Sequence, residues 1–245
     1  MSGHNKWSKI KHKKGVIDVK RSKIWTKIIR EIAVAAKIGG SIIDVNPRLR
    51  KAICDAKSAN ILKDTINKAI QKGSLSKDTV NFEELIYEGH GPNGVALLIE
   101  CMTDNRNRTL SDVRSLLNKR GGKMSATGSV LYSFKKKGKF IFKKNKFPDL
   151  TDDILLEKTI KYGIEDIKTE NDSLILLCEY QNFQKLQDRL FDENLVPTVS
   201  KILMIPDSLI DVSGDKAKIL LKLIELLEKL DDVQNVWSNM NVVVN

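Results

Sequence analysis

Cysteine and long apolar runs are scarce in this sequence, and each scarcity excludes a class of protein. The three cysteines, Cys54, Cys101 and Cys178, lie far apart with no CxxC pair and no neighbouring histidine, so neither a disulfide framework nor a zinc site is predicted. No apolar run approaches the roughly 18 residues that a bilayer-spanning helix needs, and the first residues contain no apolar signal segment. We therefore expect a cytoplasmic protein that does not insert into a membrane.

Histidine is also rare, and this leaves few candidates for catalysis. The chain has His4, His12 and His90 only, and it has no carboxylate cluster with the spacing of metal ligands. The glycine-rich segment GGKMSATGSV lacks the GKS or GKT ending of a phosphate-binding loop and does not match GxGxxG, so a turn explains it. The sequence predicts no enzyme, no catalytic residue, no metal and no cofactor.

Charge is abundant, and it is distributed as a gradient along the chain. Residues 1–80 contain 19 Lys/Arg and 6 Asp/Glu, residues 81–150 contain 13 and 7, and residues 151–245 contain 10 and 18. A basic beginning joined to an acidic end favours a polyanionic partner for the first part. The acidic part then serves solubility or contacts a protein partner.

Apolar spacing predicts three short helices between about residues 18 and 72. The first has its apolar face at three-to-four spacing and ends at Gly39-Gly40. Asn46 followed by Pro47 is typical of an N-cap and the first residue of a second helix. The third ends at Gly73, which we expect in the left-handed conformation. The apolar positions of the three faces are Trp25, Ile28, Ile29, Ile32, Ala36, Leu49, Ile53, Ala56, Ile66, Ala69 and Ile70.

After residue 76 the pattern changes to alternating strands and helices. Strands are predicted at 83–88, 94–102 and 129–134 with a helix at 106–119, and a βαββαβ order follows from 139 to 204. A helix at 215–230 and a strand at 233–244 cannot form a domain alone, so we expect them to complete the earlier sheet. The predicted fold is α+β: a three-helix domain (1–80), a discontinuous α/β domain (81–134 with 205–245) and an inserted ferredoxin-like domain (135–204).

The beginning of the chain is the strongest candidate for a binding site. Its first thirty residues hold ten Lys/Arg against one acid, Asp18. On a helical wheel, four cations of the first helix lie opposite its apolar face, and a flexible basic arm precedes them. Such an arm and helix can follow a phosphate backbone while an aromatic ring stacks on a base; a solvated charged face is the alternative. The candidate residues are Lys6, Trp7, Lys9, Lys11, His12, Lys13, Lys14, Lys20, Lys23, Lys27 and Arg30.

Two further segments have both a binding and a structural interpretation. In TDNRNRT, Asn105, Arg106 and Arg108 follow a strand and open a helix, where they can bind phosphate or simply cap the helix. The basic run at 135–146 can extend a nucleic-acid contact or protect a sheet edge from aggregation. Both alternatives stay open at the level of sequence.

Several segments resemble signatures of the YebC/PmpR family. They are MSGHNKWSKIKHKKG, KRSKIWTKIIREIAVAAKIGG, NPRLRKAI, DAKSAN, YEGHGPNGVALLIECMTDNRNRT and TGSV, which cover residues 1–130 densely. The chain departs from the family pattern at Gly89-His90-Gly91-Pro92, where Gly-Tyr-Gly-Pro is common, and at Asn60-Ile61-Leu62, where Asn-Met-Pro is usual. The functional class that the resemblance implies is unchanged by these two departures.

The resemblance implies three domains and a cytoplasmic, non-enzymatic DNA-binding transcriptional regulator. Mitochondrial relatives in this family activate translation, so the alternative is a ribosome-associated translation factor that uses the same cations on ribosomal or messenger RNA. A protein-interaction scaffold, with a partner at the acidic C-terminal half, is a third hypothesis. Because phosphate contacts are common to DNA and RNA, charge alone does not separate the first two. We expect a monomer.

Overall fold

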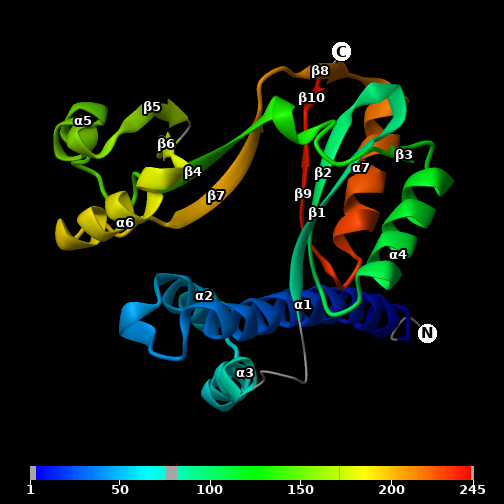
Figure 1. The fold of residues 1–245 in the computed structure, drawn as a ribbon, viewed down its shortest axis with the longest axis horizontal. Helices are drawn as coiled ribbons and strands as arrows, with labels where there is room; N and C mark the ends of the chain where they lie inside the picture. Colours follow the sequence, from blue (N-terminus) through cyan, green and yellow to red (C-terminus); the bar gives the residue numbers. More distant parts are fainter. Residues whose placement is uncertain (1–3, 76–81, 171, 244–245) are drawn as a thin grey trace. The chain divides into compact units, whose positions relative to one another are not determined.

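The computed structural model describes residues 4–75, 82–170 and 172–243, with the side chains of the first helix described from Ser22 onward (Figure 1). The chain forms two compact units. The first comprises Met1–Thr127, Val212–Val236 and Val242–Asn245, and the second Gly128–Asp211 and Trp237–Asn241. The three domain boundaries predicted from the sequence stay a prediction.

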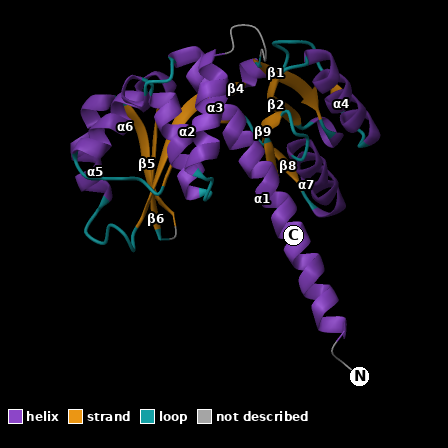
Figure 2. Cartoon of the chain, turned by 90° about the horizontal axis from the view of Figure 1, so that it is seen from below, coloured by secondary structure: helices purple, strands orange, loops and turns teal. Residues whose placement is uncertain are grey.

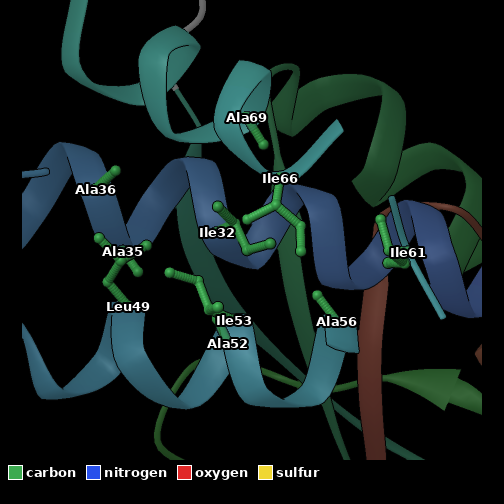
Figure 3. Close-up of a cluster of buried hydrophobic side chains, with 10 residues drawn as sticks. All are labelled: Ile32, Ala35, Ala36, Leu49, Ala52, Ile53, Ala56, Ile61, Ile66 and Ala69. Atoms are coloured by element: carbon green, nitrogen blue, oxygen red, sulfur yellow. The ribbon is translucent and has the colours of Figure 1, made fainter. Parts of the chain in front are cut away.

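The first unit begins with three helices: α1 (His4–Gly39), α2 (Pro47–Ser58) and α3 (Lys63–Leu75). Figure 3 shows the apolar side chains that α1, α2 and α3 bury together, and the most deeply buried include Ile32, Leu49 and Ala56. The Asn46 side chain accepts a hydrogen bond from the Leu49 amide, so the predicted cap of α2 is confirmed. The predicted apolar faces of these three helices are likewise those that form the core.

The first helix is longer than its apolar pattern predicts. We expected a flexible arm followed by a helix from about residue 18, whereas α1 is one helix of 36 residues from His4 (Figure 2). No proline interrupts the segment, and lysine is a good helix former, so the single Gly15 does not end the helix. The predicted stop at Gly39-Gly40 is confirmed, since Gly40 has a φ of +82°.

Gly73 does not end α3, contrary to the prediction. It lies inside the helix, and a Cβ atom at this position would stand 2.2 Å from the Ala33 carbonyl oxygen and 3.0 Å from the Ala36 Cβ. The missing side chain therefore lets α3 pack closely on α1, and no left-handed turn is involved.

A four-stranded sheet of order β3-β1-β2-β9 completes the α/β part of the first unit. Its strands are β1 (Glu83–His90), β2 (Ala96–Thr103), β3 (Lys123–Met124) and β9 (Val233–Ser238). The helices α4 (Arg106–Lys119) and α7 (Gly214–Glu228) lie side by side along it (Figure 1). The predicted return of the last strand to the earlier sheet is confirmed, because β9 lies next to β2.

The second unit is the predicted ferredoxin-like fold. Its elements are β4 (Phe134–Lys143), α5 (Asp152–Thr159), β5 (Ile164–Glu170), β6 (Ser173–Glu179), α6 (Phe183–Asp192) and β7 (Val199–Pro206). The strand order is β5-β6-β4-β7, and the neighbouring pairs are antiparallel. Phe140, Phe142 and Leu176 are fully buried at the centre of its core.

Short elements account for the remaining differences from the sequence prediction. The strand expected at 129–134 is a turn with a 3₁₀ helix, and β4 starts only at Phe134. The closing strand expected at 233–244 is broken after Ser238, and β10 (Met240–Val242) pairs with β8 (Ile210–Val212). The 3₁₀ helices are Ile43–Val45, Pro92–Gly94, Leu131–Ser133, Ile160–Tyr162 and Tyr180–Asn182. None of the helices in the described ranges has the length and apolarity needed to cross a bilayer.

Candidate nucleic-acid interface

The four cations predicted on one face of α1 are Lys20, Lys23, Lys27 and Arg30, which we call the basic row. Lys23 and Lys27 contact the end of α7 within the first unit. The Lys23 ammonium donates to the Lys229 carbonyl and lies 3.7 Å from the Asp231 carboxylate. The Lys27 ammonium donates to the carbonyl of Glu228 at 3.1 Å and to that of Gln234 at 3.3 Å. Both lysines therefore bind the main chain where α7 ends and β9 follows.

These contacts have the character of a helix cap. The last carbonyl groups of a helix have no partner within the helix, and they carry the negative end of its dipole. The ammonium groups of Lys23 and Lys27 supply both hydrogen-bond donors and positive charge to the last residues of α7. Partial burial lowers the pKa of Lys27, against the opposing influence of Glu228, and the nearby Lys23 and Arg30 lower it further.

Arg30 is more enclosed than Lys23. Its Nη1 atom donates to the carbonyls of Met102 and Asp231, both at 2.8 Å, and to Oδ1 of Asp232 at 3.0 Å. The guanidinium also lies 5.2 Å from the centre of the Phe82 ring. Only 14% of the Arg30 side chain is exposed, so this residue holds α1 against the α/β part of its unit.

The second predicted cation cluster meets the first at Asp232. Arg108 Nη2 donates to Asp232 Oδ2 at 2.8 Å and to Asp104 Oδ1 at the same distance. The hydroxyls of Thr109 and Thr103 also donate to Oδ2, at 2.7 and 3.2 Å. One buried carboxylate thus joins α1, the end of β2 and the start of α4.

The remaining residues of TDNRNRT are mainly structural. The Asn105 side chain accepts from the Arg108 amide at 3.0 Å, so the capping interpretation is confirmed. The Arg106 side chain is exposed, and its carbonyl accepts a hydrogen bond from the Tyr87 hydroxyl at 3.0 Å. Of the two arginines predicted to bind phosphate in this segment, Arg108 is in ion pairs with Asp104 and Asp232, whereas Arg106 is exposed and forms no ion pair with a described residue.

A phosphate contact by this row requires free cationic heads, whereas those of Lys23, Lys27 and Arg30 bind groups of the protein itself. Their helical spacing is as predicted, but the face opposite the apolar stripe is covered by the α7–β9 connection. The adjacent acids Asp231 and Asp232 are the sequence signal for this contact. They follow an amphipathic helix, and sequence analysis had assigned them only to a generally acidic region.

Glu31 of α1 pairs with an arginine of α2. Its carboxylate accepts from Arg48 at 2.6 and 3.0 Å, and Arg48 additionally pairs with Glu84 of β1. These pairs raise the pKa of Arg48 in spite of the burial that acts to lower it. Like Arg30, Arg48 thus connects the helices to the sheet of the same unit.

The leading turns of α1 contain the other predicted contacts. Lys6, Trp7, Lys9, Lys11, His12, Lys13, Lys14 and Lys20 occupy the segment between His4 and Arg21, and their side chains lie outside the described ones. The main chain of this segment is helical, and Figure 2 shows it continuing the axis of the part of α1 that docks on its own unit.

The basic run at 135–146 is partly neutralised within the second unit. Lys135 pairs with Asp207 at 2.8 Å, and Lys137 lies between Glu165 and Glu179. An open pocket of about 530 Å³ is lined by Lys135, Lys136, Lys137, Glu165, Glu179, Tyr180 and Gln181. Hydrogen bonds from Lys137 to Glu165 and Glu179 raise the pKa of this lysine. Within the described ranges there is no group of three or more His, Cys, Asp or Glu side chains able to hold a metal ion.

Comparisons with known proteins cover nearly the whole chain. The family model for the TACO1/YebC N-terminal domain matches residues 5–76, and the model for the TACO1/YebC second and third domain matches residues 82–240. A "Probable transcriptional regulatory protein" of Geotalea uraniireducens is 46% identical over 242 residues, covering 99% of this chain and 96% of that protein. One of the same description from Polynucleobacter asymbioticus is 45% identical over 240 residues, covering 98% and 99%.

A solved structure shares the fold as well as the sequence. The crystal structure of the conserved hypothetical protein Aq1575 from Aquifex aeolicus superposes with a TM-score of 0.81 at 36% identity. The match covers 94% of this chain and 93% of that one. The arrangement of α1 against an α/β sheet is therefore part of a fold that an experimental structure also displays.

Proposed function

This chain belongs to the TACO1/YebC family, and from that membership and the charge of α1 we propose that it is a non-enzymatic DNA-binding transcriptional regulator. The description of its relatives as probable transcriptional regulatory proteins supports the regulatory role. The proposed contact with DNA is made by the leading turns of α1, from His4 to Arg21.

The observation that carries this proposal is the charge of those turns compared with their surroundings. The segment from His4 to Arg21 has seven Lys/Arg and one acid, Asp18. The next cations along the helix, from Lys23 to Arg30, bind groups of the protein itself. The leading turns therefore supply a cationic helix just before the point where α1 docks on its own unit.

The composition of this helix favours contact with the backbone of the nucleic acid. Six of the seven cations are lysines, which act as point charges toward phosphate, whereas bidentate recognition of bases uses mainly Arg, Asn and Gln. Such contacts position a protein without reading sequence. Selectivity for particular genes would then come from DNA shape or from a further partner.

A translation factor bound to ribosomal or messenger RNA is the alternative, because the same lysines suit either backbone. We further propose that the protein works as a monomer in the cytoplasm. The acidic segment 150–204, with 11 Asp/Glu and 6 Lys/Arg, is the place for a protein partner under either function.

Salt-dependent binding tests the proposed contact. We would measure fluorescence anisotropy of labelled 24-base-pair DNA, and of single-stranded RNA of the same length, with wild-type protein and K6Q/K9Q/K13Q/K20Q. If each lysine contacts one phosphate, the slope of log K against log salt should fall by about 3 to 4 for duplex DNA. Affinity at about 0.1 M salt should fall at least tenfold.

A matched control removes the same charge elsewhere. The variant K161Q/K185Q/K201Q/K216Q alters four exposed lysines that make no ion pair with any described residue. It should retain the wild-type slope and bind within about threefold of wild type. Equal losses in the two variants would show that net charge alone matters, and the proposed contact would then be rejected.

The choice between DNA and RNA needs the protein in its cell. Lysate separated through sucrose at moderate salt should leave the protein off the ribosomal fractions, and chromatin capture should enrich promoter DNA. Co-migration with ribosomes that is lost in K6Q/K9Q/K13Q/K20Q would instead establish the translation alternative.

A further inference from the structure

The far end of α4 brings together two glycine-rich turns that are separate in the sequence. β3 pairs with the end of β1, with Gly89 opposite Met124 and His90 opposite Lys123. The His90 ring nitrogen Nδ1 lies 2.8 Å from the Ser125 hydroxyl. Through these contacts the turns HGPNG and GGKMS lie side by side, and HGPNG also packs against α7.

The main chain alone ends α4. The Gly122 amide donates to the Leu117 carbonyl at 2.9 Å and the Gly121 amide to the Asn118 carbonyl at 3.4 Å, with Gly121 at a φ of +76°. This is the Schellman arrangement, which satisfies the last carbonyls without help from side chains. The cations at this helix end are therefore not needed as caps, in contrast to Lys23 and Lys27 at the end of α7.

Four exposed cations lie on α4, directly after it and on β3: Arg114, Lys119, Arg120 and Lys123. None of the four forms an ion pair or side-chain hydrogen bond with another residue in the described ranges. The acids that flank this stretch are Asp112, two residues before Arg114, and Asp149; residues 113–148 between them include eleven Lys/Arg and no Asp/Glu. We define Arg114, Lys119, Arg120, Lys123 and the two glycine turns as the α4 tip.

The glycines of the α4 tip differ in their surroundings: the main chain is open at Gly94 and closely packed at Gly122. A Cβ atom at Gly94 would meet nothing within 4 Å, whereas one at Gly122 would stand 2.7 Å from the His90 carbonyl oxygen. Gly94 and Gly121 both have positive φ angles, which glycine adopts without strain. Because these glycines have no side chains, a flat or rod-like polyanion can approach the protein backbone there. The same polyanion can reach the four cationic side chains.

We propose that the α4 tip is a second contact for the phosphodiester backbone of a nucleic acid. This inference rests on the proposed function, because it assumes that the protein binds nucleic acid at all. The tip carries unpaired cations and accessible backbone, and it has no exposed aromatic ring or apolar cluster, so it is suited to phosphate and not to base stacking. It supplements the leading turns of α1 and extends the length of strand that one protein covers.

The tip is tested in the full-length protein with R114Q/K119Q/R120Q/K123Q. Labelled 24-base-pair DNA and single-stranded RNA of the same length are titrated by anisotropy over a series of salt concentrations. Loss of two to four phosphate contacts should weaken binding about 10- to 100-fold at about 0.1 M salt. The salt slope should fall by about 2 to 4 for the duplex and somewhat less for the single strand.

The charge-matched variant K161Q/K185Q/K201Q/K216Q serves again as the control and should bind within about threefold of wild type. Thermal unfolding should be unchanged in the tip variant, since all four side chains are exposed. As a second readout, RNA or DNA with photoreactive thiolated bases should cross-link to peptides from residues 114–125 of the wild-type protein.

The outcomes separate this inference from the proposed function. If K6Q/K9Q/K13Q/K20Q loses binding while the tip variant binds like wild type, the α4 tip is rejected and the α1 contact stands. If the tip variant alone loses binding, the second contact stands and the α1 contact fails. Unchanged binding in both variants would reject both, and it would point to an acidic protein surface as the partner of the tip.

Discussion

Arg30 and Arg108 bind opposite oxygens of the same carboxylate, that of Asp232. Arg30 Nη1 lies 3.0 Å from Oδ1, and Arg108 Nη2 lies 2.8 Å from Oδ2. The Asp232 side chain is only 9% exposed, and the hydroxyls of Thr103 in β2 and Thr109 in α4 donate further hydrogen bonds to its Oδ2 atom. Two segments that sequence analysis treated as separate phosphate-binding candidates are thus parts of one internal network.

Replacement of Asp232 by Asn should destabilise the first unit strongly. The change keeps the shape but removes the charge between two guanidinium groups, one of which is largely buried. Breaking a buried pair by removing one partner costs about 3 kcal/mol or more. Urea unfolding followed by circular dichroism measures this loss.

Asp231→Asn is the matched control for this substitution. Its carboxylate is 72% exposed and lies 3.7 Å from Lys23, so the change should cost less than about 0.5 kcal/mol. The carbonyl that accepts from Arg30 is retained in this variant. Similar losses for the two variants would contradict the central position of Asp232.

The same carboxylate should make stability depend on acid pH. Burial acts to raise the pKa of Asp232, but hydrogen bonds from Arg108 and Thr109 and the charge of Arg30 outweigh it, so the pKa lies below its ordinary value. For a depressed carboxyl pKa, the stabilisation is complete above about pH 4 and disappears as the pH falls through the folded-state pKa.

Melting temperatures of wild type and Asp232→Asn between pH 2.5 and 6 test this dependence. The difference between the two proteins should be constant near pH 6 and should narrow below about pH 4, because only wild type loses a charged pair on acidification. A difference that stays the same at every pH would argue against an ionised Asp232 in the folded protein.

Helical spacing predicted which residues of α1 share a face, but it could not predict what that face contacts. The prediction that Lys23, Lys27 and Arg30 share one face was correct. The sequence did not show that these cations bind groups of the protein instead of staying free for nucleic acid. Most of their partners lie about 200 residues away, where α7 ends and β9 follows, and local periodicity contains no information on such a contact. Charge density alone therefore overestimated the nucleic-acid contact in the docked half of the helix.

For Asn46, the sequence predicted one of its structural roles and missed the other. The Asn-Pro pair predicted its capping of α2, which the Leu49 amide confirms. The structure adds that Asn46 Nδ2 donates to the carbonyls of Ala35 and Gly40, both at 2.8 Å, which ties the end of α1 to the start of α2. These partners are main-chain carbonyls at the end of α1, so the residue types there give no sign of the contact.

Replacing Asn46 should separate its two roles. Asn46→Ser keeps an oxygen for the cap but loses both donors, and two lost hydrogen bonds at a buried position cost about 2 kcal/mol. Asn46→Ala also removes the cap and should cost about 1 kcal/mol more. Urea unfolding measures both, and equal stability of the Ser and Ala variants would show that the cap contributes nothing.

For Gly73, the local sequence predicted the wrong role, that of a helix end. A glycine near the end of an apolar helical pattern favours a left-handed terminus, yet α3 continues through it to Leu75. The residue is needed for the close approach of α3 to Ala33 and Ala36 of α1, a tertiary requirement that only the packed core reveals.

Gly73→Ala should therefore destabilise the helical core. In an isolated helix this change would stabilise by about 1 kcal/mol, because alanine has the higher helix propensity. Here the new methyl group would stand 2.2 Å from the Ala33 carbonyl oxygen, so α3 must shift away from α1. Overpacking of this kind costs about 1 to 3 kcal/mol, which outweighs the gain in propensity.

Gln71→Ala, at an exposed position of the same helix, is the control and should raise stability slightly or leave it unchanged. Thermal unfolding distinguishes the cases, since a higher melting temperature for Gly73→Ala would mean that α3 and α1 are not packed at this point.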